Sequence, residues 1–335
     1  MNETPQLIAP TPDIPLPEFP RNEELPEGCR LLEGTTDDDR LQVEYRELTY
    51  VTRTLADGAP CPRRMYVLIP SSQDPIYANY EASGYPCVVF CQGSAWHRQH
   101  LHGHLTDHMR LAERGFVVAC VQYRESELAP FPAQMQDFKT AVRYLRAHAA
   151  ELHLDPERLG FWGDSSGAHT VLMATLTAEG PASVQVEGET LELDTPDYAE
   201  WGCAPRCVVD WYGPTELSRM NLVPSAQDHT GPDTPEGSLI GHRNVLEHPE
   251  WARAASPVAY VPDASERMLP PMLIMHGGRD QLVNFDQSCR LYERLCAAGQ
   301  EVTFYKLPDA NHGSNGFRCQ EALDVVEGFL RQHLL

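Results

Sequence analysis

Residues 158–169 read RLGFWGDSSGAH, and this stretch decides the fold that we expect for the chain. A strand-like apolar run, RLGFW, leads directly into the pentapeptide Gly163-Asp164-Ser165-Ser166-Gly167, and a helical pattern, SGAHTVLMATLTA, follows it. A G-x-S-x-G sequence between a strand and a helix is typical of a nucleophile elbow, in which small residues permit a strained turn that exposes the serine. We therefore predict Ser165 as a nucleophile, with the backbone N–H of Ser166 directed at a developing oxyanion.

Strand-like and helical segments alternate on both sides of this turn. Short apolar runs, which suit buried parallel strands, occupy residues 86–91, 115–123, 206–213 and 270–277. Helical patterns occupy residues 104–115, 132–152, 285–299 and 319–334. Residues 42–55 and 63–70 alternate in polarity, as antiparallel strands with one exposed face do. This order predicts an α/β protein with a mostly parallel, doubly wound sheet and helices on both faces.

The chain has 335 residues, and we expect one large domain with insertions. Residues 1–34 carry prolines at positions 5, 10, 12, 15, 17, 20 and 26, which favours an extended arm that lies on the surface or reaches a second subunit. Residues 35–335 form the expected catalytic domain. Two long stretches, 179–205 and 216–255, interrupt its alternation of strands and helices and are predicted to be cap or lid insertions.

The charge of the chain restricts its partners. Lys and Arg total 26 against 48 Asp and Glu, for a formal net charge of −22. A field of this sign repels phosphate backbones and anionic lipids, so we expect neither nucleic acid nor membrane as a partner. The first residues lack the basic and apolar regions of a leader, and no later stretch approaches the ~18 apolar residues of a membrane span. A cytoplasmic location is therefore expected.

Two further motifs suggest the partners of Ser165. Asp280 ends HGGRD, directly after the apolar run 270–277, and a carboxylate there can orient an imidazole. Asp286 and Asp309 are its competitors for this role. His312, in Asn311-His312-Gly313, follows the run 303–310, and a neutral histidine is the usual base for a serine hydroxyl. The order Ser165, Asp280, His312 is the one that α/β-hydrolases use.

The loop after residues 86–91 reads Gln92-Gly93-Ser94-Ala95-Trp96. Small residues there let backbone N–H groups point at an oxyanion, so we predict that Ser94 and Ala95 act together with Ser166. A plain tight turn is the alternative.

Several motifs occur together in this chain, namely QGSAW, APFPAQMQDFKTAVRYLR, GDSSGAH, VVDWYGPTEL, ASPVAYV, HGGRD and NHG. In combination they resemble the acetylxylan and feruloyl esterase-like α/β-hydrolases, which are neighbours of the hormone-sensitive-lipase-like esterases. The resemblance covers roughly residues 40–335. It implies that Ser165 is the nucleophile, His312 the base and Asp280 its orienting acid, with no cofactor. Many relatives have His-Gly-Gly-Gly where this chain has Gln92-Gly93-Ser94-Ala95, and the two added Cβ atoms favour small acyl groups.

We therefore expect a serine carboxylesterase for short acyl esters. The resemblance implies O-acetyl or feruloyl groups on a small or oligomeric carbohydrate as substrate. An amidase, peptidase or formamidase with the same triad is the alternative, followed by a catalytically silent binding protein.

Side chains past the strand ends are candidates for substrate binding, namely Trp96, Tyr123, Trp211 and Tyr212. The histidines between positions 97 and 108, His104 and His108 among them, lack a recognisable ligand pattern, so we expect solvated side chains and no metal site.

Overall fold

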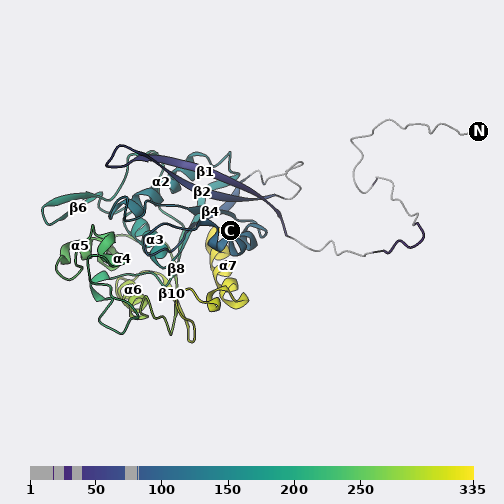
Figure 1. Cartoon of the computed structure of the whole chain (residues 1–335). Helices are drawn as coiled ribbons and strands as arrows, with labels where there is room; N and C mark the ends of the chain where they lie inside the picture. The colour runs from purple at the N-terminus through teal and green to yellow at the C-terminus, as the bar shows by residue number, and fades with distance from the viewer. Residues whose placement is uncertain (1–17, 19–25, 32–39, 72–80, 82) are drawn as a thin grey trace, which may run out of the picture. The chain divides into compact units, whose positions relative to one another are not determined.

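Within the computed structural model, which describes residues 18, 26–31, 40–71, 81 and 83–335, one sheet has eight strands in the order β1-β2-β4-β3-β5-β8-β9-β10. These strands are β1 Gln42–Thr54, β2 Pro60–Ser71, β3 Tyr85–Cys91, β4 Val117–Val121, β5 Leu154–Asp164, β8 Cys207–Trp211, β9 Met272–Gly277 and β10 Val302–Leu307. β2 pairs antiparallel with both β1 and β4, and the other neighbours pair in parallel. The predicted mostly parallel sheet with an antiparallel beginning is confirmed (Figure 1).

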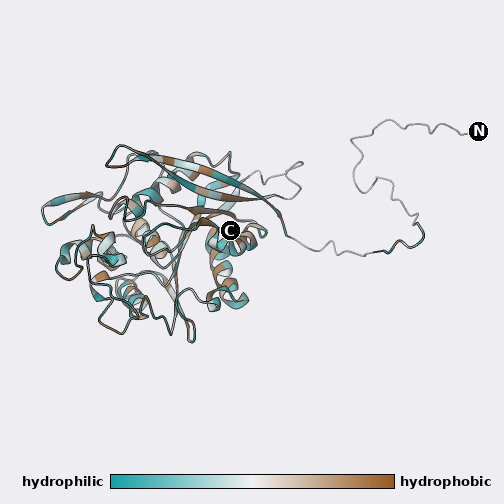
Figure 2. Cartoon of the chain, viewed as in Figure 1, coloured by the Kyte–Doolittle hydropathy of each residue, from teal (hydrophilic) through white to brown (hydrophobic). Residues whose placement is uncertain are grey.

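Helices follow the strands as the sequence pattern predicts. They are α1 Leu105–Ala112, α2 Ala133–Ala147, α3 Ser166–Leu176, α4 Pro235–Leu239, α5 Pro249–Ala254, α6 Asp286–Ala297 and α7 Gln320–Leu334. Short 3-10 helices are η3 Leu101–His104, η4 Leu217–Arg219, η5 Pro257–Tyr260 and η6 Asn315–Arg318. The helices carry both hydrophilic and hydrophobic colours along their length, as amphipathic helices on a sheet do (Figure 2). In the part of the chain that the structure describes, none of them combines the length and apolar character that a bilayer crossing requires.

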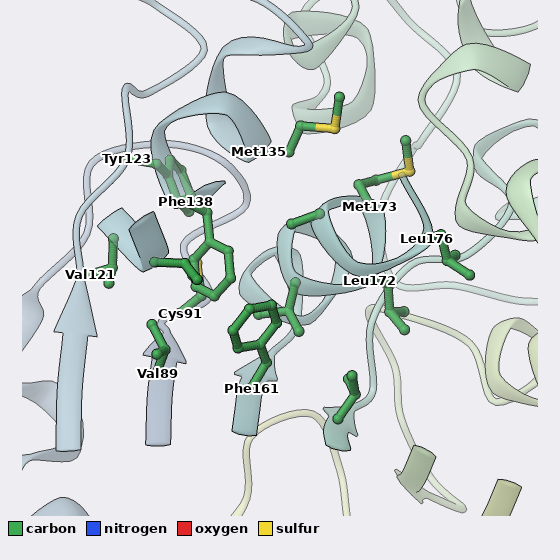
Figure 3. Close-up of a cluster of buried hydrophobic side chains, with 14 of the residues drawn as sticks. Val89, Cys91, Val121, Tyr123, Met135, Phe138, Phe161, Leu172, Met173 and Leu176 are labelled. Carbon is green, nitrogen blue, oxygen red and sulfur yellow. The ribbon is translucent and has the colours of Figure 1, made fainter. Parts of the chain in front are cut away.

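The strands bury side chains on both faces of the sheet. Successive side chains of β3 point to opposite faces of the sheet. Val89 and Cys91 belong to the core under α2, α3 and α6, whereas Val88 and Phe90 belong to the core under α1 and α7. Figure 3 shows part of the first of these cores, where Val89 of β3 belongs to one cluster with Phe138 of α2 and Leu172 of α3. A fully buried Val or Phe side chain contributes about 1.5–3 kcal/mol, so the two cores fix the register of the sheet.

The predicted insertions have different structures. Residues 179–205 include a separate antiparallel hairpin of β6 Ser183–Val186 and β7 Glu189–Glu192. Residues 216–255 contain only the short helices η4, α4 and α5, joined by turns. Most of the Pro-rich segment 1–34, and with it the predicted arm, lies outside the described residues, and residues 40–335 form one unit.

Candidate active site

Ser165 sits on a sharp turn between β5 and α3. Its backbone has φ 52° and ψ −128°, a conformation that residues other than glycine rarely adopt. The amide of Ser165 donates to the carbonyl oxygen of Trp211 at 2.8 Å, which holds the turn against β8. Gly167 is required here, because a Cβ atom at this position would lie 2.0 Å from the carbonyl oxygen of Cys91. The turn has the geometry that the G-x-S-x-G sequence predicts.

The structure brings Ser165, His312 and Asp280 together from three separate loops. The Oγ of Ser165 lies 2.9 Å from Nε2 of His312, and Nδ1 of His312 lies 2.8 Å from Oδ2 of Asp280. The Asp280 side chain is fully buried, whereas His312 keeps 15% of its side chain exposed. This chain of contacts can carry a proton from the hydroxyl to the imidazole while the carboxylate stabilises the resulting charge.

Asp280 is held by several donors at once. Its Oδ1 accepts from the backbone amides of Leu282 and Val283, each at 2.9 Å. The buried His276, for which the sequence had suggested no role, places Nε2 3.3 Å from Oδ2. Burial by itself raises the pKa of Asp280, but hydrogen bonds from His276 and His312 outweigh it and lower the pKa to about 2. The carboxylate therefore stays charged at neutral pH.

The two competing aspartates lie elsewhere. Asp309 pairs with Arg279 at 2.9 Å and is 81% exposed, and Asp286 is the first residue of α6. Neither makes the contact with His312 that Asp280 makes.

The loop after β3 contains the expected amides in a strained conformation. Ala95 and Trp96 have φ 54° and 56°, and the amide of Gly93 donates to Oδ1 of Asp164 at 2.7 Å. The amide of Ser94, predicted as an oxyanion donor, instead donates to Oγ of Ser166 at 2.9 Å. This amide is already occupied in the structure, so the amides of Ala95 and Ser166 remain the candidate donors.

Of the predicted substrate contacts, Trp96 and Tyr212 line the cavity at Ser165. Trp96 is 1% exposed, and its Nε1 donates to Nδ1 of His169 at 3.1 Å. Burial lowers the pKa of His169 to about 4, so this ring is neutral and accepts that bond. The Tyr212 ring lies 4.7 Å from the His312 ring, centroid to centroid.

The predictions for Trp211 and Tyr123 are wrong, because neither side chain lines this cavity. Trp211 is buried in the core under α1 and α7, where Nε1 donates to the Met275 sulfur at 3.2 Å. Tyr123 is buried with Val121 in the other core (Figure 3). The Tyr123 hydroxyl lies 3.2 Å from Oγ of Ser94 and 3.3 Å from Oγ of Ser166, behind the candidate donors.

His104 and His108 are buried, which corrects the expectation that they are solvated. Both rings pack on Phe90, under α1. His104 places Nε2 3.5 Å from Oδ2 of Asp164, the residue before the nucleophile. Burial opposes the charge on His104, but hydrogen bonds to Asp107 and Asp164 raise its pKa to about 9. No group of three or more possible metal ligands lies together among the described residues.

The cavity at Ser165 has a volume of about 300 Å³. Leu282 and Val283, which also position Asp280, line it, and segment 216–255 contributes Gln227, Pro235 and Glu236. Segment 179–205 supplies no lining residue and instead borders a separate hollow of about 830 Å³ beside α5 and η5. Of the two predicted insertions, only 216–255 contributes lining residues to this cavity. No motif in the sequence marks its lining residues.

The sheet order and the contacts that join Ser165, His312 and Asp280 are those of the α/β-hydrolase class. The family model BD-FAE matches residues 75–295, more than half of the chain. The chain belongs to the BD-FAE family.

Individual relatives agree with this class. Esterase LipC from Mycobacterium tuberculosis is 30% identical over 257 residues, which cover 74% of this chain and 58% of LipC. A truncated carbohydrate esterase from gut microbiota has a solved structure that is 27% identical, with a TM-score of 0.74 over 90% of this chain and 99% of that one. An esterase from Thermogutta terrifontis, 22% identical with a TM-score of 0.62 over 88% of this chain and 95% of that one, shares the fold. The chain spans about half the length of the first curated relatives that it matches.

Proposed function

We propose that the chain is a serine carboxylesterase in which Ser165 is the nucleophile. His312 Nε2 takes the proton of the Ser165 hydroxyl as Oγ attacks the ester carbonyl, and the amides of Ala95 and Ser166 donate to the oxyanion. When the C–O bond to the alcohol breaks, His312 returns the proton to the leaving oxygen. Water then attacks the acyl-enzyme and gives a proton to His312. When the bond from the acyl carbon to Oγ breaks, His312 returns that proton to Oγ, so that the carboxylic acid leaves and the Ser165 hydroxyl is restored.

One observation carries this proposal, namely the uninterrupted contact from Ser165 Oγ to His312 Nε2 at 2.9 Å and from His312 Nδ1 to Asp280 Oδ2 at 2.8 Å. The carboxylate fixes the proton on Nδ1, so that Nε2 presents a lone pair to the hydroxyl.

The size of the site supports a short acyl group. The cavity is about 300 Å³ and must hold part of the alcohol as well as the acyl chain. Trp96, whose indole is fixed by its bond to His169, lines one side, and the Cβ atoms of Ser94 and Ala95 take up space that glycines leave open. We propose acetyl as the acyl group for which this site is built.

A carbohydrate alcohol is proposed on two grounds. The resemblance in sequence is to acetylxylan and feruloyl esterase-like enzymes, and one similar solved structure is a carbohydrate esterase. O-acetylated small or oligomeric carbohydrates are therefore the proposed substrates, and the resemblance gives feruloylated carbohydrates as the alternative.

The proposal is tested by initial rates on p-nitrophenyl acetate, butyrate and octanoate, methyl ferulate and an acetylated xylo-oligosaccharide, with Ser165→Ala beside the native protein. The proposal predicts the highest rate on the acetyl esters, and no rate above background for Ser165→Ala. Hydrolysis of amides or formamides in place of every ester would replace it with the amidase alternative.

A further inference from the structure

Glu236 is a buried acid in the cavity that holds Ser165 and His312. It lies in α4, lines that cavity, and is 2% exposed. Its Oε1 lies 2.9 Å from Nδ1 of His229, which is itself fully buried. Within the described residues, its second oxygen, Oε2, has no hydrogen-bond partner. A buried acceptor of this kind normally has a partner, so an outside donor is expected.

Hydrogen-bond directions around His229 define the charge of this pair. The hydroxyl of Ser225 faces the carbonyl oxygens of Gln281 and Leu282 at 3.2 and 3.1 Å, so its proton is used there. His229 Nε2, 2.8 Å from Oγ of Ser225, can then donate to it. Nδ1 also faces an acceptor, the carboxylate of Glu236. Burial opposes a charge on His229, but the bond to Glu236 outweighs it and raises its pKa.

Both ring nitrogens of His229 thus face oxygen atoms, and the bond to Glu236 favours the protonated ring. A cationic ligand at Oε2 would be repelled by the nearby imidazolium, whereas a neutral hydroxyl donor would not be repelled. The same contacts weigh against Ser225 as a second nucleophile, because its hydroxyl also faces two carbonyl oxygens.

The backbone fixes the position of the acid. Oγ1 of Thr234 accepts from the amide of Gly237 at 3.1 Å at the start of α4. Gly237 admits a close approach of the chain, since a Cβ atom there would lie 2.1 Å from the carbonyl oxygen of Gly231. Glu236 is thus held on an element with little freedom, as a residue that recognises a ligand must be.

We propose that Oε2 of Glu236 accepts a hydrogen bond from a hydroxyl group of the ester's alcohol moiety, so that the site selects esters of hydroxylated alcohols over plain alkyl esters. This inference rests on the proposed esterase function and adds the residue that reads the alcohol. Gln227 and Pro235, which come from the same segment, line the same cavity.

The test compares substrates with and without hydroxyl groups. kcat/KM is measured for the methyl 2-, 3- and 4-O-acetyl-xylopyranosides and for cyclohexyl acetate, which has a similar ring without hydroxyls. Glu236→Gln keeps the shape of the side chain but removes its charge. It should lower the ratio of kcat/KM for the best xyloside over cyclohexyl acetate by about tenfold, as expected for a lost hydrogen bond to a charged group.

Asp233→Asn is the matched control, since Asp233 lies three residues earlier with a side chain that is 97% exposed. Its ratio should equal that of the native protein. If Glu236→Gln is unstable, Glu236→Asp keeps the charge beside His229 but withdraws the carboxylate, and it should show the same loss.

The inference is overturned if native protein and Glu236 variants give the same ratio for every xyloside while all activity still depends on Ser165. Absence of Ser165-dependent hydrolysis on all four esters would instead refute the proposed function and, with it, this inference.

Discussion

Replacement of Asp280 by Asn removes the charge beside His312 while the side-chain shape is kept. An imidazolium and a carboxylate 2.8 Å apart interact by about 332/(20 × 2.8), or about 6 kcal/mol, at an effective dielectric constant of ~20. At ~1.36 kcal/mol for each tenfold in rate, the loss is roughly ten-thousandfold in kcat. The Asn amide would also donate to Nδ1, which leaves Nε2 protonated and unable to take the Ser165 proton.

The assay for this variant is the steady-state hydrolysis of p-nitrophenyl acetate at pH 7.5, with kcat and KM determined separately. Asp309→Asn is the control, because Asp309 is an exposed aspartate that pairs with Arg279. We expect kcat to fall for Asp280→Asn with KM nearly unchanged, and neither to change for Asp309→Asn. A kcat for Asp280→Asn within tenfold of the native value would show that the Asp280 charge does not support His312.

Two predictions concern stability. Gly167→Ala should lower the free energy of unfolding in urea by more than about 4 kcal/mol, because its Cβ would lie 2.0 Å from the Cys91 carbonyl oxygen. Gly328→Ala, which has open space around it in α7, should raise the free energy of unfolding by roughly 0.5–1 kcal/mol. Equal effects of the two substitutions would contradict this prediction. The fold raises the pKa of His104 to about 9, so the protonated His104 ring stabilises the protein. This contribution is fully present below pH 6.5 and is lost as the pH rises through 9. The loss of unfolding free energy between pH 6.5 and 9.5 should therefore be smaller in His104→Gln than in the native protein by about 3 kcal/mol. An unchanged loss would show that the contact of His104 with Asp164 contributes no such energy.

Much of the fold could be predicted from local pattern. The apolar runs are buried on both faces, so they read as continuous in the sequence, and the helices between them show the spacing of one buried stripe. The strained turn at Ser165 has a signature because only small residues fit beside it. The sequence also put His312 and Asp280 at strand ends, where the parallel sheet brings them to one edge.

The wrong side-chain predictions had a readable signal. Trp211 shares the face of Cys207 and Val209 in β8, so the alternation of that strand directs it away from the cavity. His104 and His108 are four residues apart on the face that also carries Leu111, which is the buried face of α1.

Other features have no local signature. The pair of His229 and Glu236 joins a bend to the short helix α4, and the occupied amide of Ser94 depends on the rotamer of Ser166. Such contacts are set by how distant loops pack, which single-sequence patterns do not encode.

The most direct test of the central claim is active-site labelling with diethyl p-nitrophenyl phosphate, followed by peptide mapping. We predict one equivalent of p-nitrophenol per chain, a diethylphosphoryl group on Ser165, and no adduct on Ser165→Ala. An adduct on Ser225, the hydroxyl that contacts His229, or labelling of Ser165→Ala at the native rate, would contradict the assignment of Ser165 as the nucleophile.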